Sequence, residues 1–138
     1  MKRTVKFRGK SEDNSEWFYG FLQKYQEKHA SRLCICAVSV RTWKDALLYS
    51  VRPDSIGQFT GLLDKNGKEI YEGDIIGCHN PDIKHLIFYN EKQGRFMAAL
   101  NGDIENDFVG VCGLDDSRWN ASKEVIGNVY DNPELLKL

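Results

Sequence analysis

The stretch QFTGLLDKNGKEIYEGDII, Gln58 to Ile76, constrains the fold most strongly, because it places an Asn-Gly pair between two apolar runs. Asn and Gly tolerate the positive φ that a tight hairpin turn requires. A Gly-Asp pair near its end predicts a second turn before the next strand. The stretch therefore predicts a chain that reverses twice between short β-strands. Its turn and structural residues are Gln58, Gly61, Asp64, Asn66, Gly67, Glu72, Gly73 and Asp74.

Short aromatic or alternating runs recur in the rest of the chain and favour further strands. Between 17–23 and 33–40, the polar segment 24–32 is expected to be a loop or a short helix. Asp131 or Asn132 caps an expected helical turn that begins at Pro133. With about six to eight short strands separated by turns, the sequence predicts a barrel or roll. The expected strands are 4–8, 17–23, 33–40, 46–51, 75–78, 85–90, 95–100 and 124–130, and Gly94 closes the hairpin between two of them.

The chain has 138 residues, of which 41% are apolar and 28% charged, as is typical of one globular domain. Its formal charge of −1 lacks the strongly basic footprint of many nucleic-acid-binding proteins. Charge is nevertheless uneven along the chain. Either the two charged stretches are solvated or neutralise each other across a sheet, or the basic one is an arm that contacts phosphates. The basic stretch contains Lys2, Arg3, Lys6, Arg8 and Lys10, and the acidic one Asp103, Glu105, Asp107, Asp115 and Asp116.

Targeting signals are not found in this sequence. The longest apolar run, LCICAVSV, is far shorter than the roughly 20 residues of a membrane span. The basic start has no apolar segment behind it, unlike a signal peptide. We therefore expect a cytoplasmic protein without membrane contact.

The carboxylates of the opening stretch could in principle serve acid–base chemistry. Such chemistry requires one carboxyl group with a raised pKa, and nothing in the sequence indicates one. Glu72, Gly73 and Asp74 are more typical of an exposed corner at which Asp74 binds backbone amides. The spacing from Gly61 to Lys68 does not fit a phosphate loop, and Asp64 to Gly67 does not fit a calcium loop.

Cysteine and histidine are too widely spaced for a zinc motif, which needs two residues between paired cysteines. A Cys/His nucleophilic pair, including one with His29, has no local signature either. We therefore predict no catalytic, metal-binding or cofactor-binding residue. The possible ligands considered are Cys34, Cys36, Cys78, His79, His85 and Cys112.

Aromatic residues cluster beside the basic N-terminal strand, as in small barrels that stack bases on a sheet. Alternating aromatics in strands usually pack into a core, so the core interpretation is favoured. The nucleic-acid interpretation assigns phosphate contacts to the five basic residues from Lys2 to Lys10. The aromatics concerned are Phe7, Trp17, Phe18, Tyr19 and Phe21.

Four segments together resemble the YopX family of phage and prophage proteins. They are VRPDSIGQFTGLLDKNGKEIYEGDII, KFRGK, WFYGFL and EVIGNVYDNPELL. The resemblance implies an SH3-like β barrel or roll with an added N-terminal β segment. It also implies self-assembly, because proteins of this family are thought to self-assemble. It implies no enzymatic activity and no catalytic residues.

We accordingly predict a mainly β fold, with an N-terminal β segment over 1–52 packed on an SH3-like barrel over 53–138. The first functional hypothesis is a non-enzymatic module that binds a protein partner as a homo-oligomer. The second is a nucleic-acid-binding barrel, and the third is a small enzyme that uses carboxylate or Cys/His chemistry. The predicted core contains Ile56, Phe59, Leu62, Ile70, Tyr71, Ile75, Ile76, Val125, Ile126 and Val129.

Overall fold

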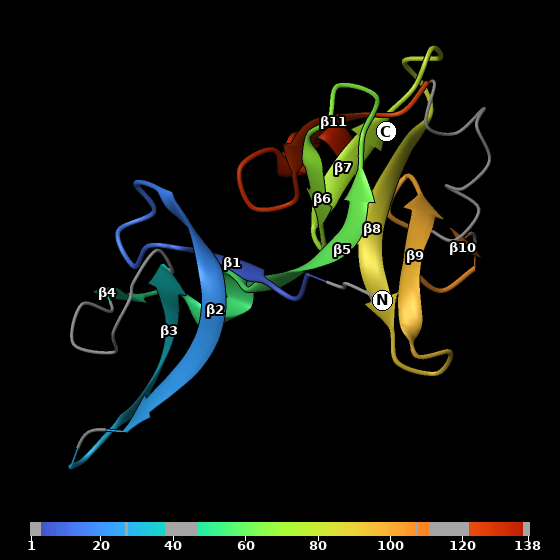
Figure 1. Cartoon of the computed structure of the whole chain (residues 1–138). Helices are drawn as coiled ribbons and strands as arrows, with labels where there is room; N and C mark the ends of the chain where they lie inside the picture. Colours follow the sequence, from blue (N-terminus) through green and yellow to red (C-terminus); the bar gives the residue numbers. More distant parts are fainter. Residues whose placement is uncertain (1–3, 27, 38–46, 107, 111–121, 137–138) are drawn as a thin grey trace. The chain divides into compact units, whose positions relative to one another are not determined.

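The computed structural model describes residues 4–26, 28–37, 47–106, 108–110 and 122–136 (Figure 1). Its contacts group the chain into two compact units, residues 1–59 and 60–138. Both units are built from antiparallel strands, and the described helices are two short 3-10 turns. The predicted mainly β fold is therefore confirmed, as is the C-terminal helical turn. The packing of segment 1–52 on the barrel stays a prediction.

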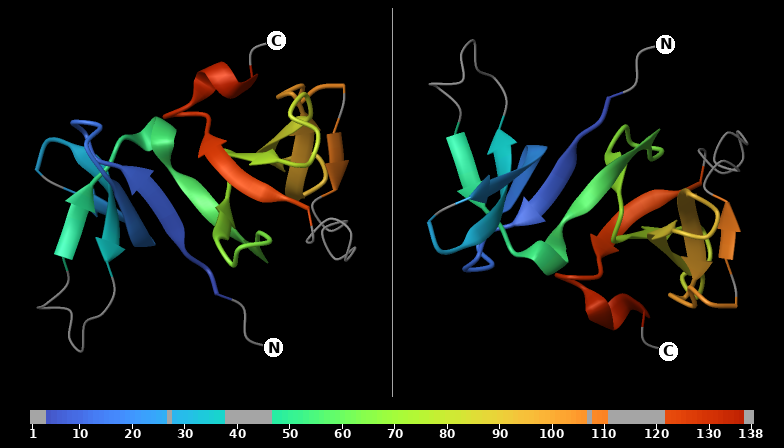
Figure 2. Two further views of the ribbon diagram at one scale, coloured as in Figure 1. Left: turned by 90° about the horizontal axis from the view of Figure 1, so that it is seen from above. Right: turned by 90° about the horizontal axis from the view of Figure 1, so that it is seen from below.

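In the first unit the strand order is β4-β3-β2-β1-β5. Strand β5 supplies its first residues to this unit and its later ones to the second (Figure 2). Val51, just after β4, bridges to Ser11 after β1 and donates its N–H to Leu33 of β3. The sheet consequently curls until its first and fourth strands meet. The elements are β1 (Phe7–Lys10), β2 (Trp17–Gln26), β3 (Ser31–Ala37), β4 (Leu47–Ser50), η2 (Pro53–Ser55) and β5 (Gly57–Leu63).

One face of this curled sheet forms the core of the first unit. Ile35 and Val51 are buried there, at 0% and 2% exposed. Phe18 and Tyr49 stack on the same side with ring centroids 4.0 Å apart. Gly9 is required at this point, because a Cβ on it would lie 2.8 Å from Cβ of Val51.

In the second unit, β6 is hydrogen-bonded to β5, and a separate five-stranded sheet has the order β10-β9-β8-β7-β11. Its core joins Ile70, Ile76, Ile87 and Ala98, with Leu62, Phe96 and Val125 packed against them. The elements are β6 (Glu69–Tyr71), β7 (Asp74–Gly77), β8 (Lys84–Asn90), β9 (Arg95–Leu100), β10 (Phe108–Gly110), β11 (Glu124–Asn128) and η4 (Pro133–Leu136).

Most of the predicted core is buried or packed against the core. The prediction that Ile126 belongs to the core was wrong: it lies 40% exposed, because it follows Val125 in β11 and successive residues of a strand point to opposite faces. The segment 24–32 was also misjudged. Its two ends belong to β2 and β3, which pair as far as Gln26 and Ser31, so cross-strand pairing outweighs the polar composition.

Candidate functional site

Asp64 is the residue of the opening stretch whose hydrogen bonds are clearest. Its Oδ1 accepts hydrogen bonds from the N–H groups of Asn66 and Lys68, at 2.8 and 2.9 Å. Its Oδ2 accepts one from the N–H of Val125 at 3.0 Å. Burial raises the pKa of Asp64, but these N–H donors and the Lys68 charge outweigh that effect and hold it below its usual value. Asp64 is thus a carboxylate that fixes the Asn-Gly turn, in which Gly67 has φ +79°.

Asp74 also supports a turn, although not at the exposed corner that we expected. Its side chain is 1% exposed, and Oδ2 accepts the N–H of Tyr71 at 2.7 Å. Gly73 donates its N–H to Ile87 and accepts the N–H of Val129, so strands on both sides cover the turn. The predicted bond to a backbone amide is confirmed, whereas the exposed position of Asp74 was wrong.

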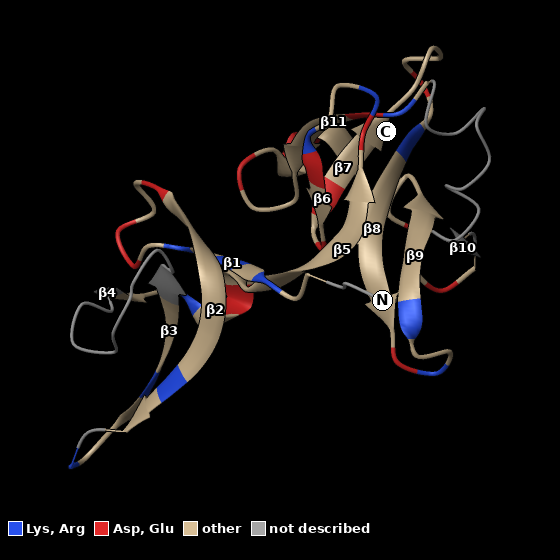
Figure 3. Cartoon of the chain, in the orientation of Figure 1, with Lys and Arg blue, Asp and Glu red and all other residues tan. Residues whose placement is uncertain are grey.

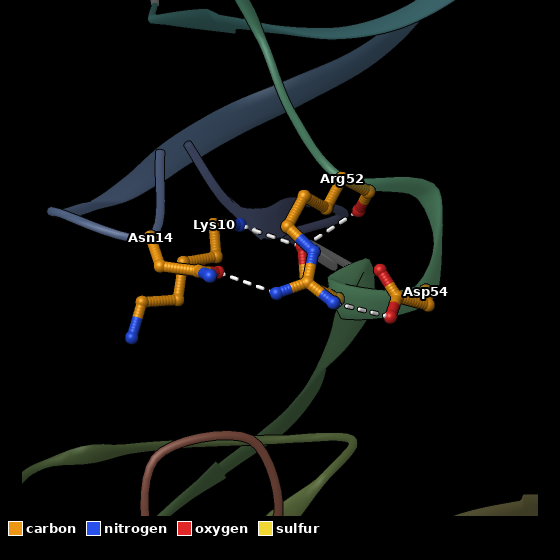
Figure 4. A network of polar contacts seen from close by, with 5 residues as sticks. Lys10, Asn14, Arg52 and Asp54 are labelled. Carbon is orange, nitrogen blue, oxygen red and sulfur yellow. Dashed lines mark hydrogen bonds and ion pairs between the residues drawn. The ribbon is translucent and has the colours of Figure 1, made fainter. Parts of the chain in front are cut away.

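Arg52, in the RPDS segment, ties this segment to β1 (Figure 4). Its N–H donates to the carbonyl of Lys10 at 2.9 Å. Its guanidinium donates to Asn14 and to Asp54, the latter at 2.7 Å. Ser55 accepts the N–H of Lys10 at 2.8 Å and donates to the Arg52 carbonyl at 2.6 Å. The segment is therefore an anchor between elements of the first unit.

The basic residues predicted to contact nucleic acid divide into three groups. Lys2 and Arg3 lie outside the described residues. Arg8 is 5% exposed, and its guanidinium lies 4.6 Å from the ring centroid of Trp17. Lys6 and Lys10 are half-buried beside the rings of Phe59 and Trp17, with Nζ 5.4 and 5.6 Å from the centroids.

The aromatics beside them lie on both faces of the first unit's sheet. Phe18 belongs to the core face, as the favoured core interpretation predicts, but for Tyr19 and Phe21 that interpretation was wrong. Tyr19, Phe21 and Tyr25 lie on the opposite face of β2 and are 49%, 54% and 45% exposed. We call these three residues the aromatic face. Sequence analysis missed Tyr25, because it lies in the segment expected to be a loop or a short helix. The period-two spacing from Tyr19 was the available signal.

Cysteine and histidine do not converge in the described part of the chain. No group of three or more His, Cys, Asp or Glu residues there could hold a metal ion. Cys34 is buried and Cys78 half-buried, and neither forms a disulfide with another described residue. Cys112 and the side chain of Cys36 lie outside the described residues.

A groove of about 540 Å³ lies beside β8 in the second unit. Its apolar walls come from Phe88, Tyr89, Ile104 and Phe108, and Phe88 meets Phe108 edge to face with centroids 5.9 Å apart. Tyr89 and Ile104 are 43% and 48% exposed. The polar lining residues are Asn90, Glu91, Lys92 and Glu105. We call this hollow the β8 groove.

The fold and these surfaces define a small all-β protein with an exposed aromatic face and an apolar groove. The chain belongs to the YopX family, since the family model described as "YopX protein" matches residues 6–137. It is similar to the crystal structure of protein EF1440 from Enterococcus faecalis, with 25% identity and a TM-score of 0.56. That match covers 99% of this chain and 100% of the other. No curated protein matches the chain.

Among the described residues, no helix is long and apolar enough to cross a membrane.

Proposed function

We propose that this protein is a non-enzymatic assembly protein of phage or prophage origin that acts in the bacterial cytoplasm and binds further copies of itself. The observation that carries the proposal is the β8 groove, where Tyr89 and Ile104 are left about half exposed. Apolar side chains gathered around a groove are typical of surfaces that a partner covers.

The occupant that we propose is the segment before β1, residues 4–6 of a second copy. Val5 in this segment is 43% exposed, and Lys6 follows it. The walls of the groove suit an apolar side chain such as Val5. Two carboxylates, Glu91 and Glu105, against the single cation Lys92 suit a basic segment. The predicted neutralisation of the two charged stretches would then occur between copies.

Such an interface is heterologous, because the segment of one copy meets the groove of another. Repetition gives a ring when the rotation closes, and reciprocal exchange between two copies gives a dimer. We therefore expect a discrete oligomer.

Sedimentation velocity of three variants tests this proposal. Ile104→Glu places a charge on the groove wall, and Val5→Glu reverses the character of the segment, so both should sediment as monomers. Leu63→Glu is the matched control, because Leu63 is 50% exposed on β5 but does not line the groove. Monomeric wild-type protein would contradict the proposal, as would Ile104→Glu and Val5→Glu oligomers that match the wild type.

A further inference from the structure

The aromatic face of β2 carries cations and no described carboxylate. Residues directly opposite each other in paired strands share a face of the sheet. Tyr19 pairs with Arg8, and Tyr25 pairs with Arg32. Trp17 pairs with Lys10. Strands β1, β2 and β3 therefore carry rings and positive charges on one face, where Arg8 is buried and Arg32 is exposed, and Figure 3 shows Lys and Arg along β1.

The rings of this face are exposed although the sheet has a core available on its other side. Phe18 and Ile35 fill that core, whereas Phe21 is 54% exposed. Tyr19 and Phe21 are two residues apart on one strand, so their Cα atoms are separated by about 7 Å, and Tyr25 continues the row. Such a row of rings is spaced to stack successive unpaired bases.

Two cations near the row have no ionic partner within the described structure. The side chains of Lys28 and Arg32 are exposed and form no hydrogen bond or ion pair with another described residue. Arg32 lies directly opposite Tyr25 and so shares the face of the rings, whereas Lys28 lies in the turn that follows β2.

We propose that the aromatic face binds single-stranded nucleic acid, with bases stacked on Tyr19, Phe21 and Tyr25 and phosphates held by Lys28 and Arg32. A duplex fits less well, because its bases are already stacked and cannot cover the rings. The proposal is independent of self-assembly, because it uses a different surface on the other unit.

The test is fluorescence anisotropy of the full chain with a labelled 12-mer of deoxythymidine at 50 and 200 mM NaCl. Phe21→Ala and Tyr25→Ala should each weaken binding about ten-fold without changing the salt dependence. Lys28→Ala combined with Arg32→Ala should weaken binding and reduce the slope of log affinity against log salt by about 1.4.

Two controls separate this result from general damage. Ile126→Ala removes an apolar side chain of comparable exposure from the second unit. Lys65→Ala removes a cation that is paired with Glu124 at 3.3 Å. Both should bind the oligonucleotide as the wild type does.

Three results would overturn the proposal. One is the absence of binding at 50 mM NaCl, and another is a matched duplex that binds as tightly as the single strand. The third is a loss of oligomer mass in Phe21→Ala, which would assign the aromatic face to a protein contact. Since Ile104→Glu leaves the aromatic face intact, it should still bind the 12-mer even if self-assembly fails.

Discussion

Asp64 shows how one side chain joins distant parts of the second unit. Its two oxygens hold the turn that follows β5 and, at the same time, the backbone of β11, 61 residues further along the chain. Asp64 is 7% exposed, so water replaces these bonds poorly when the carboxylate is changed.

Asp64→Asn should lower the free energy of unfolding by about 2 kcal/mol, because an amide cannot accept all three N–H groups and loses the negative charge. Asp82→Asn, at an exposed loop position, should change stability by less than about 0.5 kcal/mol. Urea denaturation of both variants measures the difference. Equal stability of the two would contradict the role assigned to Asp64.

The lowered pKa of Asp64 also predicts a pH dependence. In acid the unfolded chain takes up a proton at this group before the folded protein does, so the stabilisation is complete above about pH 5 and is lost as pH falls below the ordinary value of 3.8. The stability difference between wild type and Asp64→Asn should therefore shrink from pH 7 to pH 2.

Asp13 titrates in the same acidic range, because hydrogen bonds from Ser11 and Ser15 lower its pKa to about 2. It is present in both proteins, so its effect cancels in the comparison. A difference that stays constant from pH 7 to pH 2 would show that the charge of Asp64 does not stabilise the fold.

The local role of Asp64 could be predicted from the sequence, but its distant bond could not. The Asn-Gly turn can be predicted from a few adjacent residues, and Gly67 has the expected positive φ. Contact with Val125 depends on how β11 pairs with β7, which no short pattern specifies. The alternation of residues in WFYGFL likewise predicts that this strand has two faces. Because both faces carry aromatic residues, the sequence does not indicate which face is buried.

At the scale of elements, the closure of the first unit depends on the contact between β1 and the end of β4. The close approach of Gly9 to Val51 leaves no space for a side chain at the position of Gly9 in β1. Val is stiff about χ1, so it cannot rotate away at low cost.

Gly9→Ala should destabilise the protein by about 1–3 kcal/mol through overpacking against Val51. Gly9→Ala combined with Val51→Ala should lose less stability than the sum of the two single variants, because the new methyl group occupies part of the vacated space. Thermal or urea unfolding of the four proteins completes the cycle. Additive losses would contradict direct contact between these residues.

The β2–β3 hairpin is the element that sequence analysis predicted least well. Lys24, Tyr25 and Gln26 have the composition of a loop, yet each pairs with a residue of β3. Strand formation there depends on the partner strand rather than on local preference. Sequence analysis therefore did not predict the strand positions of the cations Lys24 and Arg32 in this hairpin.

At the scale of the whole molecule, the chain forms two compact units joined within the single strand β5. The family and the mainly β class were predictable, because turn glycines and motif segments recur along nearly the entire chain. The surfaces were not, since the groove combines residues from several elements and the exposure of the aromatic face depends on which side of the sheet forms the core. The β8 groove, for example, joins Phe88 of β8 to Ile104 and to Phe108 of β10.

Light scattering on a size-exclusion column, with the absorbance ratio of nucleic acid to protein read across the peak, tests self-assembly most directly. At low salt the protein should elute as one species whose mass is an integer multiple of 15.8 kDa, twofold or higher. Nucleic acid carried in that peak and removed by high salt would support the aromatic face as well, and the mass of the protein alone is then read in high salt. A mass of 15.8 kDa at every concentration would contradict the proposed assembly.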